Sequence, residues 1–452
     1  MVLKRLPGKP SSDKWEKVAA RKAADTASRI PREWVLNESQ LHDARNCRDI
    51  TGDFIAGLLP DKVCTITALS AAELTEGIRK RKFSATEVTL AYCRRAAVAH
   101  QVNNCLHEIF FDQAIQRAGP LHGVPISLKD QFYVKGVETS MGYVGWIGTV
   151  EGNKQSPEYK IRESVITKAL LNLGAVLYCK AGFMSTSIES LKLIQMALLS
   201  TQPWISDAEV VPMPWRPEYE EVEKNLCFGL LNCDRYVMPH PPVLRALRLL
   251  QEALEQRGHR NEFMYCDGGA NIWTQLNLSG EPPIKELEDE LGDGARPPMT
   301  LLDFQKLTLQ RDKYRQKYRE YWNSTIELTG TGRPADAFIM PVAPHAAVIP
   351  GKYFHYDYSD IVNLLDYTSV VIPVIKADKH LDKPNKAYQP VNDVDKMNWE
   401  AYDADIYDGA PVGIQIVARQ FQEERCLSLA NEVVKALEEY GYGKSVVERV
   451  EN

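Results

Sequence analysis

The sequence predicts an α/β protein whose sheet is packed by helices on both faces. Short apolar runs, typical of buried strands, alternate with longer segments in which apolar residues recur at helical spacing. Two capping boxes mark helix starts in the first hundred residues. The chain has 452 residues, of which 44% are apolar and 25% charged, and this composition is typical of a globular protein with a large core.

The first expected helix begins at Ser12 or Asp13, either of which can act as its cap, and runs to about Ser28. Ile30-Pro31 ends it, because proline and the residue before it do not continue a helix. The segment from Asp13 to Ser28 is rich in Lys, Arg and Asp. It could pack on the body or on a second subunit, but a solvated face is favoured.

Ser70-Ala-Ala-Glu73 and Ser84-Ala-Thr-Glu87 each have the pattern of a capping box and predict two further helices. The polar stretch from Lys376 to Ala404 is expected to be a surface loop. The expected strands are Val124–Leu128, Ala175–Tyr178, Cys227–Leu231, Ala337–Met340, Val370–Ile375 and Val412–Val417. Helices are expected between them at Val165–Leu173, Ser187–Leu199, Pro242–Arg257 and Leu302–Thr325.

The charge balance argues against a nucleic-acid-binding protein. The net charge is −6, whereas a nucleic-acid surface needs clustered Lys and Arg. The nine cysteines are scattered without a C-x-x-C pair, which favours reduced thiols in an intracellular protein. The N-terminus lacks the apolar run of a signal peptide, and no segment is apolar enough to span a bilayer. A cytoplasmic protein is therefore expected.

The segment from Gly119 to Asp130, GPLHGVPISLKD, is the most informative stretch. Lys129 directly follows the strand-like run Ile126-Ser127-Leu128, which we expect to be buried. Burial would lower the pKa of Lys129 and favour the neutral amine, which can act as a general base. On composition alone, a solvated Lys-Asp pair or a surface ion pair is the more common arrangement.

The segment GPLHGVPISLKDQFYVKGVETSMG resembles the lysine motif of the amidase signature family, and the chain is similar to the acetamidase-type branch. Further segments that resemble this branch are SATEVTLAYCRRAAVAHQVNNCLHEIFFDQA from Ser84, ESVITKALLNLGAVLYCKA from Glu163, PVAPHAAVIPG from Pro341, NLLDYTSVVIPV from Asn363 and YDGAPVGIQIVAR from Tyr407. The resemblance implies the amidase-signature fold, with a mixed central sheet covered by helices on both faces.

The resemblance also implies an enzyme that hydrolyses the C–N bond of linear carboxamides to a carboxylate and ammonia or an amine. In this family a nucleophilic serine, a bridging serine and a lysine form the catalytic relay. Lys129 corresponds to the general base of that relay. Small aliphatic or aryl amides are the implied substrates, and the resemblance implies no metal or organic cofactor.

The two serines of this relay are missing from the chain. In the family, a G-G-S-S-G-G motif and a G-T-D-x-x-G-S motif follow the position of Ala181, whereas here Gly182 follows directly. We infer a missing block of about 80 to 100 residues, judged from the family's size and usual domain lengths. Smaller gaps fall between Ala118 and Gly119 and near Arg260. The expected domains are an N-terminal helical arm, residues 1–60, and an α/β amidase domain in which residues 61–181 and 182–452 are joined across this block.

Without the nucleophile, the literal chain is expected to be close to inactive, and loss of a central block should expose the strands Val124–Leu128 and Ala175–Tyr178. Three interpretations remain open. The sequence is an incorrect or alternative version of a working amidase, it is a pseudoenzyme that acts by binding, or it is a truncated remnant that does not fold. Independently of these interpretations, the chain could assemble as a homodimer.

Ser185 and Ser187 are the candidates to replace the nucleophile, but they lack flanking glycines and are better explained as caps of the following helix. The nine histidines show no metal-ligand spacing; His345 is the most interesting by context, although a core or loop role is favoured. Cys227 and Cys233 are interpreted as structural. Packing is favoured over a substrate-channel wall for the cluster Tyr353, Phe354, Tyr356 and Tyr358.

Overall fold

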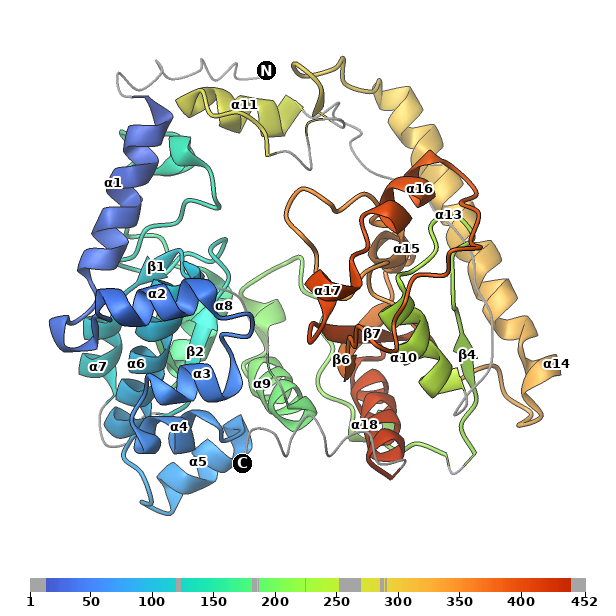
Figure 1. The fold of residues 1–452 in the computed structure, drawn as a ribbon, viewed down its shortest axis with the longest axis horizontal. Coiled ribbons are helices and arrows are strands. Elements are labelled where there is room, and N and C mark those ends of the chain that lie inside the picture. The colour runs from blue at the N-terminus through green and yellow to red at the C-terminus, as the bar shows by residue number, and fades with distance from the viewer. Residues whose placement is uncertain are drawn as a thin grey trace. The chain divides into compact units, whose positions relative to one another are not determined.

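The computed structural model describes residues 14–118, 123–180, 185, 187–223, 225–251, 270–284, 288 and 291–439. The chain divides into two units: unit 1 comprises Met1–Trp215 and Asn271–Pro283, and unit 2 comprises Arg216–Ala270 and Ile284–Asn452. Each unit has its own sheet and its own set of helices, which Figure 1 labels in chain order. The core is therefore formed separately in each unit.

Both predicted capping boxes are present in unit 1 and start α5 (Ala71–Arg79) and α6 (Ala85–Asn103). The N–H of Glu73 donates to Ser70 Oγ at 3.2 Å, and the N–H of Glu87 donates to Ser84 Oγ at 3.1 Å. The other described helices of unit 1 are α1 (Trp15–Ser28), α2 (Glu38–Asn46), α3 (Gly52–Gly57), α4 (Asp61–Thr67), α7 (Phe111–Arg117), α8 (Val165–Asn172), α9 (Ile188–Ser200) and α11 (Ala270–Ser279).

Helix α1 ends at Ser28, as predicted from Ile30-Pro31, whereas the proposed caps Ser12 and Asp13 lie outside the described residues. The expectation of a solvated face holds for most of α1 but is wrong for Lys22. Lys22 lies 14% exposed and forms ion pairs with Glu108 and with Glu138. The two carboxylates are themselves buried and need a cation, since an unpaired buried charge is costly. The helix therefore packs on the body of unit 1.

The sheet of unit 1 has the strand order β1-β3-β2. β2 (Pro125–Leu128) runs parallel to β3 (Val176–Lys180), and β1 (Glu108–Ile109) runs antiparallel to β3. One face packs on α6 and α7 through a cluster that includes Cys93, Ala97, Phe111, Val176 and Cys179. The other face packs on residues that include Ile126, Leu128, Val134, Leu170 and Leu177.

These two clusters contradict the prediction that a missing block leaves β2 and β3 exposed. Val176 is 0% exposed and Leu128 is 1% exposed. Helices α6 and α7 cover one face, and α8 with the turn that contains Val134 and Val137 covers the other. The strands therefore keep a closed core within unit 1.

The sheet of unit 2 has the order β4-β5-β7-β6, with β4 parallel to β5 and the other pairs antiparallel. Its strands are β4 (Phe228–Leu230), β5 (Ala337–Pro341), β6 (Thr368–Lys376) and β7 (Pro411–Ala418). Its described helices are α10 (Pro241–Gln251), α13 (Leu301–Ser324), α14 (Ile326–Thr329), α15 (Asp357–Leu365), α16 (Asp393–Glu400), α17 (Ala404–Tyr407) and α18 (Glu423–Glu439).

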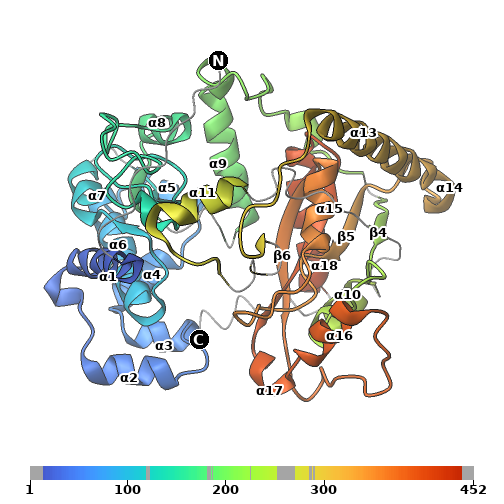
Figure 2. The ribbon, with the colours of Figure 1, turned by 90° about the horizontal axis from the view of Figure 1, so that it is seen from above.

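Alternation along the strands places apolar residues on both faces of this sheet. Phe338 and Val417 pack with Trp322 of α13 and Ile361 of α15. Intervening residues such as Ile416 are also fully buried. Helices α10 and α18 pack against β6 and β7 (Figure 1), and Figure 2 shows α18 from a second side, next to β6. The sheet is therefore covered on both sides along β5 and most of β7, whereas β6 leaves Ser369, Val371 and Pro373 exposed on one face.

The predicted α/β class is confirmed, and the described residues form it as two mixed sheets, one in each unit. The six predicted strands are all present within one or two residues of their expected ends. The prediction for Lys376–Ala404 is partly wrong, because α16 lies within it and buries Asp395 and Asn398. In the part of the chain that the structure describes, no helix combines the length and apolarity needed to cross a membrane.

Candidate functional site

Lys129 is the first residue after β2, and its side chain is exposed. Its carbonyl oxygen accepts a hydrogen bond from the N–H of Phe132 at 3.1 Å, so the chain turns as soon as the strand ends. Its ammonium group forms no hydrogen bond or ion pair with any residue that the structure describes. The expected burial of Lys129 is therefore wrong. At the end of β2 the core takes in Leu128 and Asp130, and Lys129 points away from it.

Asp130 is 5% exposed and anchors the loop that follows Lys129. Its Oδ2 atom accepts hydrogen bonds from the N–H of Ser140 at 3.1 Å, from Ser140 Oγ at 3.0 Å and from the N–H of Met141 at 2.7 Å. Asp130 thus belongs to a buried network and is not the solvated partner of Lys129. This network fixes the backbone on the C-terminal side of Lys129.

The buried lysine of this region is Lys180, the last residue of β3, which is 0% exposed. Its Nζ atom donates to Asp130 Oδ1 at 3.2 Å, to the Glu138 carbonyl at 2.7 Å and to Thr139 Oγ1 at 2.7 Å. Burial lowers the pKa of Lys180, although the carboxylate of Asp130 opposes this effect. Lys180 therefore holds together the segment that follows Lys129.

Sequence reasoning missed Lys180. A signal was present, because the apolar run Ala175–Cys179 ends in a lysine just as the run before Lys129 does. The two strands are neighbours in register, with Leu128 paired to Lys180, so the sheet brings the two lysines to the same edge. The sequence does not show which of them the loop from Asp130 to Met141 will cover.

Ser185 and Ser187 occupy the start of α9, as the capping interpretation predicts. Ser187 is the N-cap, and its Oγ accepts a hydrogen bond from the N–H of Ser190 at 3.2 Å. Ser185 Oγ donates to the Ser187 carbonyl at 3.2 Å. Neither hydroxyl contacts Lys129 in the described part of the chain. The junction between Ala181 and Gly182 lies outside the described residues.

His345 is 5% exposed, and neither ring nitrogen has a hydrogen-bond partner among the described residues. Its ring lies 4.8 Å from that of Tyr353 and 6.1 Å from that of His240. Burial lowers the pKa of His345 to about 4. His345 belongs to unit 2, whereas Lys129 belongs to unit 1.

The aromatic cluster near His345 consists of residues packed in unit 2. Tyr358 is 1% exposed, and its hydroxyl donates to the Val237 carbonyl at 2.7 Å. The rings of Tyr353 and Tyr356 lie 4.3 Å apart. These contacts favour packing over a channel wall. Cys227 and Cys233 are half-buried free thiols.

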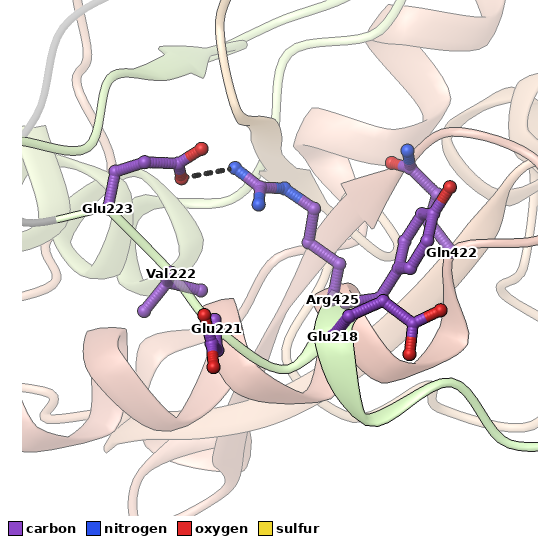
Figure 3. A pocket seen from close by; sticks show the side chains of 7 residues that line it. Glu218, Glu221, Val222, Glu223, Gln422 and Arg425 are labelled. Carbon is purple, nitrogen blue, oxygen red and sulfur yellow. Dashed lines mark hydrogen bonds and ion pairs between the residues drawn. The ribbon is translucent and has the colours of Figure 1, made fainter.

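An open surface pocket of 490 Å³ lies in unit 2, where the segment after Pro217 meets α18. Figure 3 shows the Arg425 side chain reaching the carboxylate of Glu223, at 2.7 Å. Arg425 also binds Asp336 at 2.7 Å. The side chains that line this pocket include none from the lysine motif; they are Glu218, Tyr219, Glu221, Val222, Glu223, Gln422 and Arg425. Their chemistry does not suit amide hydrolysis, because they include no hydroxyl nucleophile next to a base.

One group in the described residues has the side chains to hold a metal ion. Asp234, His355 and Asp357 place one potential ligand atom each within 4.8 Å of the others. Sequence reasoning did not find this group, since Asp234 and His355 are 121 residues apart and share no local motif.

Comparison with known proteins shows which family the chain belongs to. The chain matches the Amidase family over residues 87–181 and 286–427. It is 30% identical to the acetamidase of Emericella nidulans in an alignment of 556 positions that covers 94% of this chain and 98% of that protein. It is also 30% identical to the acetamidase of Aspergillus oryzae, with 94% and 99% of the two chains covered.

A solved structure, fatty acid amide hydrolase, resembles the fold with a TM-score of 0.80 and 22% identity, over 94% of this chain and 95% of that one. The lysine motif and β3 lie inside the first segment of the family match, and β5, β6 and β7 lie inside the second. The sequence resemblance and the fold thus agree, and the chain belongs to the amidase family, by which it is an amidase-type hydrolase of carboxamide C–N bonds.

Proposed function

We propose that this chain is an acetamidase-type amidase that retains the fold of its family. Its hydrolysis of carboxamides is lost or severely impaired. The observation that carries the proposal is the position of Lys129. It is exposed at the end of β2 and has no serine hydroxyl in hydrogen-bond contact among the described residues. A lysine base needs a bridging hydroxyl to transfer a proton from the nucleophile. Lys129 is the proposed general base of a relay whose two serines the chain does not contain.

Three observations support a missing internal block. The family match stops at residue 181, which is the junction where the serine motifs would begin, and resumes only at residue 286. The alignment with the Emericella nidulans acetamidase has 556 positions, whereas this chain has 452 residues, so at least 104 positions have no counterpart here. The described strands also form two separate sheets.

The expected loss of rate follows from the chemistry of the missing groups. Removing the nucleophile of a serine hydrolase costs on the order of 10⁶ in rate, which corresponds to about 8 kcal/mol of activation free energy. Loss of the backbone donors beside the nucleophile would remove stabilisation of the oxyanion as well. An exposed amine cannot replace these contributions.

The test is ammonia release from acetamide and benzamide by the purified chain. We expect no release above that of Lys129→Ala. Lys135→Ala is the matched control, because Lys135 is an exposed lysine of the same loop. Turnover that depends on Lys129 and survives Lys135→Ala would refute the proposed loss of hydrolysis.

Binding of a small carboxamide without turnover is the second candidate function. Two observations favour this candidate over an unfolded remnant. Both faces of the unit 1 sheet have a closed core, and the hydrogen bonds of Lys180 and Asp130 fix the loop that follows Lys129. Chemical-shift changes on addition of benzamide that are lost in Lys129→Ala would support this candidate. A flat near-ultraviolet circular dichroism spectrum would instead indicate the remnant.

The remaining proposals concern the cell and the gene. We propose that the protein is cytoplasmic and that it forms a homodimer. Cell fractionation tests the first proposal, and light scattering of the purified protein tests the second. A transcript that carries an additional in-frame segment between the codons of Ala181 and Gly182 would show that a complete amidase is also made. That product should hydrolyse carboxamides through Lys129.

A further inference from the structure

Asp234, His355 and Asp357 form a compact group in unit 2 that the amidase relay does not use. Asp234 is 5% exposed and His355 is 4% exposed, whereas Asp357 is half-buried. His355 Nε2 lies 2.5 Å from Asp234 Oδ2. The three ligand atoms, one from each residue, all lie within 4.8 Å of one another.

The backbone holds the side chain of Asp234 in place. Asp234 Oδ1 accepts hydrogen bonds from the N–H of Tyr236 at 2.8 Å and of Val237 at 2.9 Å, which leaves Oδ2 directed at His355. Asp357 is the first residue of α15, and the N-cap Tyr356 provides no side-chain hydrogen bond. The carboxylate of Asp234 is therefore fixed by the turn that follows it, and Asp357 enters the group from the first turn of α15.

The charge of the group suits a cation. Asp234 accepts hydrogen bonds from the N–H groups of Tyr236 and Val237 and pairs with His355, and these are the partners that a buried carboxylate needs. Asp234 is thus held as a carboxylate although it is buried. Together with Asp357 it places two acidic side chains against a single imidazole.

The donor set selects the class of ion. One imidazole nitrogen and two carboxylate oxygens suit divalent transition ions such as Zn²⁺, whereas Mg²⁺ and Ca²⁺ prefer oxygen ligands alone. Zn–N and Zn–O bonds of about 2.0–2.2 Å require ligand atoms roughly 3 to 3.6 Å apart. The ligand atoms therefore have to move by about 1 Å, and the His355–Asp234 hydrogen bond has to open, for all three to reach one ion.

From this geometry we infer that Asp234, His355 and Asp357 form a binding site for one divalent transition-metal ion, with Zn²⁺ as the best fit. The ion would join the turn after Cys233 to the start of α15, which are linked in this region by the His355–Asp234 pair and by the hydrogen bond from the Asp234 N–H to Tyr358 Oη at 3.2 Å. Its role is structural, because metal binding to the folded state stabilises that state.

The experiment titrates Zn²⁺ into the full chain, purified without a tag and stripped of metal, in competition with a chromophoric chelator. We expect one equivalent of bound Zn²⁺ and a higher unfolding temperature. Asp357→Asn should weaken binding at least tenfold, since it removes a charged ligand while leaving the helix intact. Asp360→Asn is the matched control, because Asp360 lies in the same first turn of α15 but outside the group.

Co²⁺ provides a second measurement that does not depend on stability. Its visible absorption bands report coordination by nitrogen and oxygen ligands and should disappear in His355→Gln. Near-ultraviolet circular dichroism of each variant separates loss of binding from loss of fold. Absence of stoichiometric Zn²⁺ in the wild-type chain, or equal affinity in Asp357→Asn and Asp360→Asn, would overturn the inference. Tight binding of Mg²⁺ with no preference for Zn²⁺ would also contradict it.

Discussion

Lys129 and Lys180 follow neighbouring parallel strands at the same edge of the unit 1 sheet, but their surroundings differ completely. Lys180 is fully buried and binds Asp130, Glu138 and Thr139, whereas Lys129 is exposed and contacts no described side chain through its ammonium group. A lysine can be buried only where other groups accept the hydrogen bonds of its ammonium group, because an unpaired buried charge is too costly. The loop that follows Lys129 supplies those groups to Lys180.

This difference shows that a lysine at the end of a well-formed, buried strand can still lack the neighbouring groups that catalysis requires. Lys129 sits in a well-formed motif, and the motif folds around Asp130. A catalytic lysine also needs a second segment that covers it and supplies hydroxyl groups. Lys180 obtains its cover from residues 130–139 of the same loop, and Lys129 has no comparable cover in the described residues.

The largest expected effect comes from removing the buried amine. Lys180→Met should lower the free energy of unfolding by about 3 kcal/mol or more, because it leaves Asp130 buried without its cation. Lys129→Met should change it by less than about 0.5 kcal/mol, as expected for an exposed side chain without partners. Urea unfolding followed by circular dichroism measures both.

A double variant sharpens this test. Asp130→Asn removes the charge that Lys180→Met leaves uncompensated, so the combined loss should be smaller than the sum of the two single losses. Additive losses would mean that Lys180 acts through its packing alone. Equal losses for the variants of Lys129 and Lys180 would show that their different burial has no energetic consequence.

Two buried histidines give a contrast to Lys180. Among the described residues, the ring nitrogens of His345 have no hydrogen-bond partner, and those of His240 have only the carbonyl of Asn398, at 2.8 Å. Burial lowers the pKa of His240 to about 4 and that of His345 to about 4, both below the ordinary value of 6.5. Between pH 4 and pH 6.5 the folded state therefore binds fewer protons than the unfolded state. Their contribution to stability is complete above pH 6.5 and is lost as the pH falls towards 4, by about 3 kcal/mol for each ring at most.

The free energy of unfolding measured from pH 7 to pH 4 should therefore fall more steeply in the wild-type chain than in His345→Phe. Phenylalanine keeps the contact with Tyr353 but cannot titrate. An identical pH dependence in the two proteins would exclude His345 as a source of the acid sensitivity.

A third contrast lies within α1, between Lys22 and Lys17. Lys22 pairs with the buried Glu108 and Glu138, whereas Lys17 is exposed. We expect Lys22→Ala to lower the free energy of unfolding by about 2 kcal/mol, since two buried carboxylates lose a partner. Lys17→Ala should have little effect. Equal effects would mean that α1 packs on unit 1 without help from the ion pairs.

Much of the fold could be predicted from sequence because the signals are local. Capping boxes at Ser70 and Ser84 and apolar runs such as Val412–Val417 report structure over a few residues. The pattern of apolar runs does not show β1, because two residues carry no periodicity. The ion pair between Lys180 and Asp130 joins residues 50 positions apart, and the His355–Asp234 pair joins residues 121 positions apart, so no local pattern could show either.

The smallest expected effect concerns the serines after the junction. If Ser187 is only a helix cap, Ser187→Ala should lower the free energy of unfolding by about 1 kcal/mol. Ser185→Ala, which removes a hydroxyl that caps no helix N–H, should cost less. Neither change should alter ammonia release, because neither hydroxyl contacts Lys129 in the described structure. A loss of measurable turnover in Ser187→Ala, with Ser185→Ala unaffected, would instead make Ser187 the nucleophile and turn the exposed Lys129 into a base that acts after a rearrangement of the loop.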